Sequence, residues 1–183
     1  MIFTKLRLKN FKSHENTTIK FEKGISVIVG ENGAGKSSIL EAISFALFKQ
    51  HTGKKIDDLV RNNAESMSVE LEFISNARQY KIVREKKSNL KSSIFKKTSA
   101  DGNYVHICTG DKEVTNEIRQ ILDIDSDLFL NAIYIRQGEI AELVDKTPSE
   151  KKQLIGKLLG IDSLEKSWKN LLPLINDYEN QLS

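Results

Sequence analysis

The chain has 183 residues, of which 39% are apolar and 29% charged, a size and composition that are ordinary for one globular domain with a real core. Its net charge of +3 excludes a nucleic-acid field spread over the whole surface, so any DNA contact must come from local clusters. One cysteine, no signal-peptide region and no bilayer-length apolar run exclude a disulfide framework and a membrane span, and we expect a soluble, intracellular, cytoplasmic protein.

The N-terminal residues predict three strands. Apolar and charged residues alternate over 2–11, which indicates a first strand, and a second β-type run covers 17–21. We expect a polar loop over 12–16 between them. The continuous β-branched run over 25–29 is typical of a strand that is buried on both faces.

A phosphate-binding loop follows this third strand. Residues 30–37 read GENGAGKS and match the pattern G-x-x-x-x-G-K-[ST] in full, with an amphipathic helix predicted over 37–49. Glycines let successive N–H groups point into one concavity, to which the helix adds its free N–H groups and its dipole. Lys36 would meet the β- and γ-phosphates, and the Ser37 hydroxyl is a suitable Mg²⁺ ligand. A chance glycine-rich turn is the alternative, and the flanking elements favour nucleotide binding.

The apolar residues of this helix recur at helical spacing and predict its inner face: Leu40, Ile43, Ala46 and Leu47. Residues 52–63 are polar and irregular. Further strands are predicted over 68–73, 79–85, 91–97 and 104–108. Asp101 and Gly102 form a hairpin turn within this stretch. The middle of the chain is therefore predicted to be an antiparallel meander.

Two helices are predicted after the meander. The first covers 111–122. The second begins at Thr147 and Glu150, which have capping-box spacing, with Pro148 at the first helical position, and Gly160 would end it.

A heptad pattern occupies the end of the sequence. Its positions are Leu164, Trp168, Leu171, Ile175, Tyr178 and Leu182. The pattern predicts the start of a coiled coil over 161–183, after a first domain over 1–160. A single amphipathic core helix is the alternative, and Pro173 argues for a kink.

Three motifs together resemble one known family. They are NFKSH at 10–14, GENGAGKSS at 30–38 and FLNAIYIRQGEI at 129–140. They look like the N-terminal lobe of the Rad-fifty ATPases, SMC-like ABC proteins of DNA double-strand-break repair. The resemblance implies an α/β P-loop fold of ABC type. In this fold a mixed sheet and an antiparallel β layer are followed by a helix that enters a coiled coil.

The resemblance also implies ATP and Mg²⁺ as cofactors, and it assigns site residues. Nucleotide contacts fall on Lys12, Asn32, Gly33, Ala34, Gly35, Lys36, Ser37, Ser38, Arg61, Asn62 and Gln137. Lys36 and Gln137 would serve catalysis, and Ser37 and Gln137 would bind the metal. Lys12 stands where the family often has Arg, so it keeps the charge but loses the planar fork. The alternative for Gln137 is a solvated loop glutamine.

Three motifs of the complete family machinery are not found in this sequence: an apolar run ending in Asp-Glu, an LSGG-type signature and a Cys-x-x-Cys hook. The family carries them beyond its coiled coil, so we expect ATP hydrolysis to need a C-terminal half. Implied partners are that half, a second ATPase head in an ATP-dependent homodimer, an Mre-eleven-type nuclease and double-stranded DNA. The rivals are a chromosome-structuring SMC or recombination-mediator ATPase, and a non-hydrolysing nucleotide-sensing scaffold.

The densest basic stretch lies on the predicted meander. It contains Lys81, Arg84, Lys86, Lys87, Lys91, Lys96 and Lys97. It would contact DNA phosphates without sequence preference, or it is a solvated strand face whose lysines guard a sheet edge. The sequence leaves both interpretations open.

Overall fold

The computed structural model describes residues 1–98, 102–124 and 147–150, and the single residues 126, 129, 168, 171 and 173. The chain divides into two compact units, Met1–Ser126 and Asp127–Ser183. The first unit contains the sheet and the phosphate-binding loop. The predicted boundary at 160 and the coiled coil over 161–183 lie outside the described residues and stay predictions.

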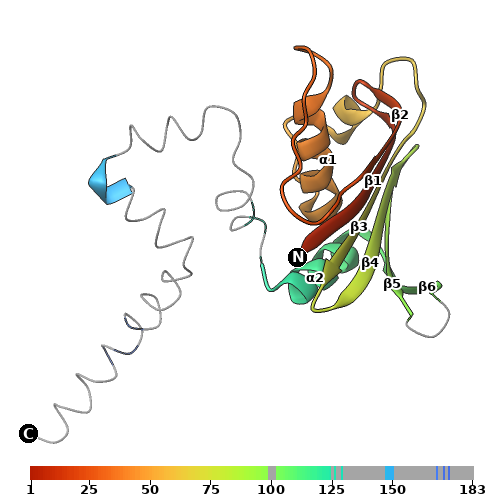
Figure 1. The fold of residues 1–183 in the computed structure, drawn as a ribbon. Helices are drawn as coiled ribbons and strands as arrows, with labels where there is room; N and C mark the ends of the chain where they lie inside the picture. Colours follow the sequence, from red (N-terminus) through yellow and green to blue (C-terminus); the bar gives the residue numbers. More distant parts are fainter. Residues whose placement is uncertain are drawn as a thin grey trace, which may run out of the picture. The chain divides into compact units, whose positions relative to one another are not determined.

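Six strands form one antiparallel sheet in the order β2-β1-β3-β4-β5-β6 (Figure 1). The strands are β1 Ile2–Phe11, β2 His14–Lys20, β3 Met67–Ser75, β4 Arg78–Lys86, β5 Leu90–Lys97 and β6 Tyr104–Thr109. The α/β class and the antiparallel meander are confirmed. Within the described residues every strand pairing is antiparallel, so the parallel part of the expected mixed sheet is not found there.

Two helices cover the same face of this sheet (Figure 1). Alternate residues of β3, such as Leu71 and Phe73, are fully buried on that face, because strand side chains point to opposite sides. Helix α2 (Asp111–Leu122) adds Val114 and Ile118, and its predicted bounds are confirmed.

Helix α1 (Lys36–Phe48) follows the phosphate-binding loop, as predicted. Its buried residues run continuously from Glu41 to Phe48, so this part of the helix is enclosed on all sides. Leu40 departs from the predicted inner face, because it is 44% exposed and lines an open apolar hollow of about 460 Å³. Phe3, Phe21 and Ile28 also line that hollow.

The predicted strand over 25–29 is wrong for this chain. These residues are not a strand in the structure, and Ile25, Val27 and Val29 are 96%, 77% and 85% exposed. A strand needs a neighbour for its N–H and C=O groups, and none of the six strands pairs with this segment. The β-branched sequence is therefore present without the pairing that would bury it.

The predicted polar loop over 12–16 is also wrong. Phe11 of β1 pairs with His14 of β2, so only Lys12 and Ser13 form the turn. His14 is 8% exposed. The polar stretch over 52–63, expected to be irregular, contains the short 3₁₀-helix η1 (Ile56–Leu59).

Part of the second unit can be described by itself. Residues 148–150 are helical, and the capping box is confirmed. The Thr147 hydroxyl and backbone N–H donate to the Glu150 carboxylate at 2.7 and 2.8 Å, and the Glu150 N–H donates back at 3.4 Å. Across the part of the chain that the structure describes, no helix combines the length and apolarity needed to cross a bilayer.

Candidate nucleotide site

The phosphate-binding loop is curled around its own lysine. Gly33 and Gly35 have φ of 84° and 92°, left-handed values that a side chain would strain. The Lys36 ammonium donates to the carbonyls of Gly30 at 2.8 Å and of Glu31 at 2.7 Å. The lysine therefore lies inside the bend of the loop, where a phosphate bound to the loop would meet its charge.

The N-terminus of α1 is open to an anion. Its first-turn N–H groups have no partner within the helix, and the N-cap residue Gly35 supplies no side-chain hydrogen bond. The first turn carries no acidic residue that would compete with phosphate. These features fit the predicted phosphate contacts of residues 32–38.

Ser37 is the predicted metal ligand. It lies in the first turn of α1, and its side chain is exposed. Within the described ranges no group of three or more His, Cys, Asp or Glu side chains could hold a metal ion. The residues present fit Mg²⁺ bound through the Ser37 hydroxyl and phosphate oxygens, since Mg²⁺ is commonly held by few protein ligands plus substrate phosphates.

The β1–β2 turn packs closely on this loop. A Cβ on Gly35 would lie 2.4 Å from Ser13 Oγ and 2.6 Å from His14 Nε2, so only glycine fits there. The His14 ring bridges Gly35 and Thr17, with Nε2 at 3.1 Å from the Gly35 carbonyl and Nδ1 at 3.0 Å from Thr17 Oγ1. Because a carbonyl only accepts, Nε2 carries the proton.

Lys12 is held in this turn by its backbone and by its side chain. Its φ is 48°, and its N–H donates to the Leu59 carbonyl at 2.8 Å. Its ammonium forms an ion pair with Glu41 on α1 and donates to Thr52 Oγ1 at 3.2 Å. In the structure, the charge of Lys12 is thus paired with a carboxylate of the loop's own helix.

The Glu41 carboxylate remains ionised although it is buried. Burial by itself would raise the pKa of Glu41, but hydrogen bonds from Lys12 and Thr52 outweigh it and hold that pKa below its ordinary value. The ion pair is therefore a fixed part of the site at neutral pH.

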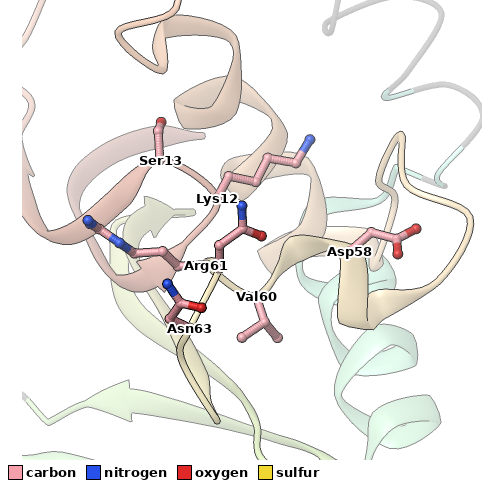
Figure 2. Close-up of a pocket in the computed structure, with 7 residues that line it drawn as sticks. Lys12, Ser13, Asp58, Val60, Arg61 and Asn63 are labelled. Atoms are coloured by element: carbon pink, nitrogen blue, oxygen red, sulfur yellow. The ribbon is translucent and has the colours of Figure 1, made fainter.

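Beside this turn lies an open pocket of about 470 Å³ (Figure 2). It is lined by Lys12, Ser13, Asp58, Val60, Arg61, Asn62 and Asn63. The charged ends of Lys12 and Arg61 point away from each other in Figure 2, and Arg61 pairs with Glu15 at 3.2 Å. Ser13 belongs to this lining and also touches the phosphate-binding loop.

The structure thus brings three predicted residues together: Lys12, Arg61 and Asn62 line one pocket. Gln137 lies outside the described residues, so its assignment stays a prediction. Sequence reasoning missed His14 and Glu41. A carboxylate inside the apolar run ILEAISFALF was the signal available for Glu41, because a charge is rarely placed in a buried helix face without a partner.

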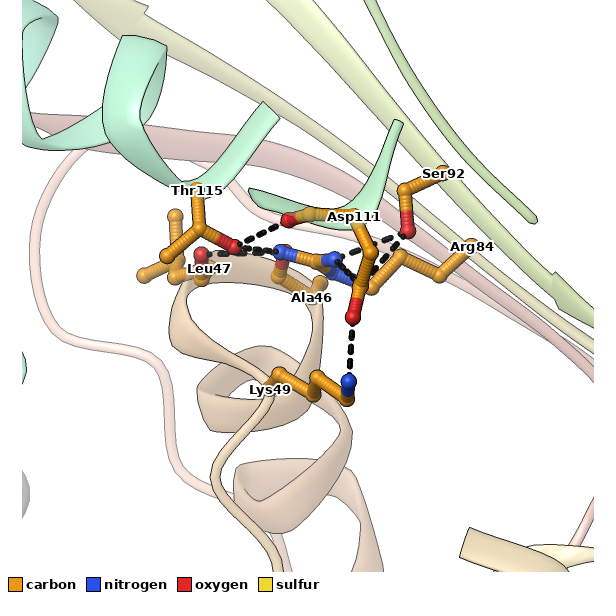
Figure 3. A network of polar contacts seen from close by, with 7 residues as sticks. All are labelled: Ala46, Leu47, Lys49, Arg84, Ser92, Asp111 and Thr115. Atoms are coloured by element: carbon orange, nitrogen blue, oxygen red, sulfur yellow. Dashed lines mark hydrogen bonds and ion pairs between the residues drawn. The ribbon is translucent and has the colours of Figure 1, made fainter. Parts of the chain in front are cut away.

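The basic stretch is not one surface. The prediction that Arg84 belongs to this surface is wrong, because Arg84 is fully buried between α1, β5 and α2 (Figure 3). Lys86 pairs with Asp57 at 2.8 Å, and the Lys81 ammonium lies 4.4 Å from the ring centroid of Tyr104. Lys87, Lys91 and Lys97 are exposed.

Comparison with known proteins supports the resemblance drawn from the motifs. A family described as AAA domain matches residues 5–183. Two relatives described as DNA double-strand break repair Rad50 ATPase also match. The protein of Methanocaldococcus jannaschii is 43% identical over 182 residues, and that of Methanococcus maripaludis is 41% identical over 186 residues. Each match covers 100% of this chain and 18% of the relative, so the chain spans less than a fifth of their length.

A solved structure shows a similar fold. The recombination mediator protein RecF with ATP superimposes with a TM-score of 0.52 at 21% identity. The match covers 96% of this chain and 45% of that chain. At this level of identity the similarity concerns the fold alone.

Proposed function

Because the chain belongs to the AAA domain family and matches the N-terminal part of Rad50 ATPases over its whole length, we propose that it is the ATP-binding lobe of a DNA double-strand-break-repair ATPase. The observation that carries the proposal is the uncapped start of α1 behind a glycine loop that encloses Lys36. This arrangement suits a phosphate chain and its Mg²⁺. Lys12, Arg61 and Asn62 would border the nucleotide.

The proposal includes a C-terminal half that completes the head. Hydrolysis needs a positioned water and stabilisation of developing charge as well as a phosphate cradle, and we assign the missing carboxylate and signature motif to that half. Gln137 would reach the metal and the attacking water. The exposed β-branched segment 25–29 supports this assignment, because strands supplied by another polypeptide segment would give it partners.

The proposed mechanism is a nucleotide-gated clamp. Two heads close around two ATP molecules, and each nucleotide lies between one phosphate-binding loop and the signature motif of the other head. Closure would then change the coiled coils and control an Mre-eleven-type nuclease. In physical terms, ATP shifts the population toward the closed dimer because it binds that state more tightly.

Calorimetric titration with ATP·Mg²⁺ tests the binding part of the proposal. We expect binding to the chain combined with its C-terminal half, and Lys36→Gln should weaken it at least about tenfold, the effect of removing one strong charge-assisted contact. Lys87→Gln is the matched control, because it neutralises an exposed lysine far from the loop in sequence. No heat with ATP from the folded combination would refute the proposal.

Measuring phosphate release tests whether ATP hydrolysis needs both the chain and its C-terminal half. The chain alone should show little or no turnover, and adding the separately expressed C-terminal half should restore it. Robust hydrolysis by the chain alone would contradict this part of the proposal.

A further inference from the structure

Glu41 is a charged residue in an otherwise apolar part of α1. It is 5% exposed, and its neighbours Ala42 and Ile43 belong to the hydrophobic core. Burying a carboxylate is costly unless charged or hydrogen-bonding partners compensate for the lost water. The hydrogen-bond partners of the Glu41 carboxylate therefore indicate its role in the structure.

These partners come from two segments outside α1. Oε1 accepts from the Thr52 N–H and from the Thr52 hydroxyl, each at 2.7 Å, and Oε2 accepts from the Lys12 ammonium. Lys12 belongs to the β1–β2 turn, whereas Thr52 lies in the loop between α1 and η1. The Lys12 ammonium also donates to Thr52 Oγ1, which closes the three residues into one network.

The same three segments carry the predicted nucleotide contacts. Helix α1 begins with Lys36 and Ser37, the turn carries Lys12, and the loop from Thr52 continues through η1 to the pocket residues 61–63. A side chain that ties these segments together sets the distance between the phosphate-binding loop and the pocket. Of the three network residues only Lys12 lines the pocket, whereas Glu41 and Thr52 are not among its lining residues.

We infer that Glu41 is a positioning residue for nucleotide binding, which acts by holding the Lys12 turn and the Thr52 loop against the helix of the phosphate-binding loop. The inference rests on the proposed function, because it concerns the same site. Geometry and burial carry it: a shielded carboxylate accepts three hydrogen bonds, one from the Lys12 turn and two from Thr52 in the loop that leads to the pocket.

A simpler role for Glu41 predicts the opposite change in ATP affinity when Glu41 is neutralised. If Glu41 were only a negative charge near the phosphates, it would repel ATP and compete for Lys12. Neutralising it would then strengthen ATP binding. If Glu41 positions the Lys12 turn and the Thr52 loop, neutralising it weakens ATP binding although a repulsive charge has been removed.

Calorimetric ATP binding by Glu41→Gln, in the chain combined with its C-terminal half, separates the two roles. We expect affinity to fall about tenfold, the size of one strong charge-assisted contact. In a Lys12→Gln background the same substitution should reduce affinity clearly less than tenfold, because the contact of Glu41 with the Lys12 turn is already gone and only its contacts with Thr52 remain to be lost. Unchanged or tighter binding by the single variant, or a tenfold loss in both backgrounds, would overturn the inference.

Thr52→Val provides a second variant if Glu41→Gln does not fold. It removes the hydroxyl from the network, keeps the backbone N–H and changes no charge, so we expect about a threefold loss of ATP affinity. Affinity equal to that of the unsubstituted protein would count against the inference. Failure of the unsubstituted protein to bind ATP would refute the proposed function itself, whereas normal binding with an unaffected Glu41→Gln variant overturns the positioning role alone.

Discussion

The guanidinium of Arg84 lies 2.9 Å from the Asp111 carboxylate and is wholly shielded from solvent, so that β4 is joined to the first residue of α2 through the core. Arg84 also donates to the Ala46 carbonyl at 2.8 Å and to the Leu47 carbonyl at 3.2 Å, the last turn of α1 (Figure 3). Burial lowers the pKa of Arg84 to about 10, and Asp111 opposes that shift, so the charge persists at neutral pH. One side chain thus ties the end of the phosphate-loop helix to its neighbours.

Arg84→Met should destabilise the protein strongly. Methionine would leave the Ala46 and Leu47 carbonyls without this buried donor, whereas Asp111 keeps Lys49 and Ser92 as partners. Each buried acceptor left unsatisfied costs about 1–3 kcal/mol. The free energy of unfolding of Arg84→Lys should lie between those of the wild type and Arg84→Met, because lysine keeps the charge but lacks the five N–H donors of the guanidinium. Urea unfolding followed by circular dichroism measures these free energies of unfolding.

Lys91→Met is the control for Arg84→Met. Lys91 lies exposed on the adjacent strand β5, and surface substitutions of this kind usually change stability by within about 0.5 kcal/mol. Equal stability losses for the two variants would show that the network around Arg84 contributes nothing.

The stability that Glu41 contributes should depend on pH. Its folded-state pKa lies below the ordinary value, so the stabilisation is fully present above the unfolded-state pKa of about 4.5 and is lost as pH falls through the folded-state pKa. The difference in free energy of unfolding between wild type and Glu41→Gln should therefore be constant near neutrality and narrow below about pH 4.5. Urea titrations at several pH values measure it, and a difference independent of pH would exclude the ion pair as its source.

Gly35→Ala should damage the phosphate-binding loop more than Gly33→Ala. Both positions have left-handed φ, which strains alanine by roughly 1–2 kcal/mol. Only at Gly35 would the added Cβ collide, with Ser13 Oγ and His14 Nε2, whereas nothing lies within 4 Å at Gly33. Thermal unfolding should rank the variants in that order, and the reverse order would contradict the packing of the β1–β2 turn on the loop.

Three exposed lysines of the basic stretch remain as candidates for DNA contact: Lys97, and Lys87 and Lys91 at the hairpin between β4 and β5. If Lys87 and Lys91 meet phosphates, the double charge reversal Lys87→Glu/Lys91→Glu should weaken binding to duplex DNA and lower the magnitude of the salt slope by about one per lysine. Fluorescence anisotropy over a salt series measures both effects.

The matched control reverses two exposed charges on the helical side of the sheet, Lys112→Glu/Arg119→Glu on α2. This control variant changes the net charge by the same amount as Lys87→Glu/Lys91→Glu, so the two variants differ only in where the reversed charges lie. Equal effects of the two pairs would mean that the protein attracts DNA through its total charge and that the hairpin between β4 and β5 is no special contact surface.

Sequence reasoning succeeded where a short stretch specifies its own conformation. The strict alternation around 68–73 marked β3, and the spacing of Thr147 and Glu150 marked a capping box that the structure contains. Sequence reasoning failed where the environment of a residue depends on contacts with segments that are distant in sequence. Alternation along β4 puts Arg84 on the same face as the buried Tyr80 and Ile82. Nothing in the sequence indicated the groups that accept its hydrogen bonds, because these lie on α1 and α2, far away in sequence.

The local sequence by itself determined the phosphate-binding loop, the helix behind it and the antiparallel strands, because glycine placement and side-chain periodicity act within a few residues. Tertiary structure alone decided that residues 25–29 stay exposed, that Lys12 pairs with Glu41 and that Arg84 donates to groups on α1 and α2. Strand pairing and the burial of charge depend on which segments meet, and that is settled only when the whole sheet and its helices pack together.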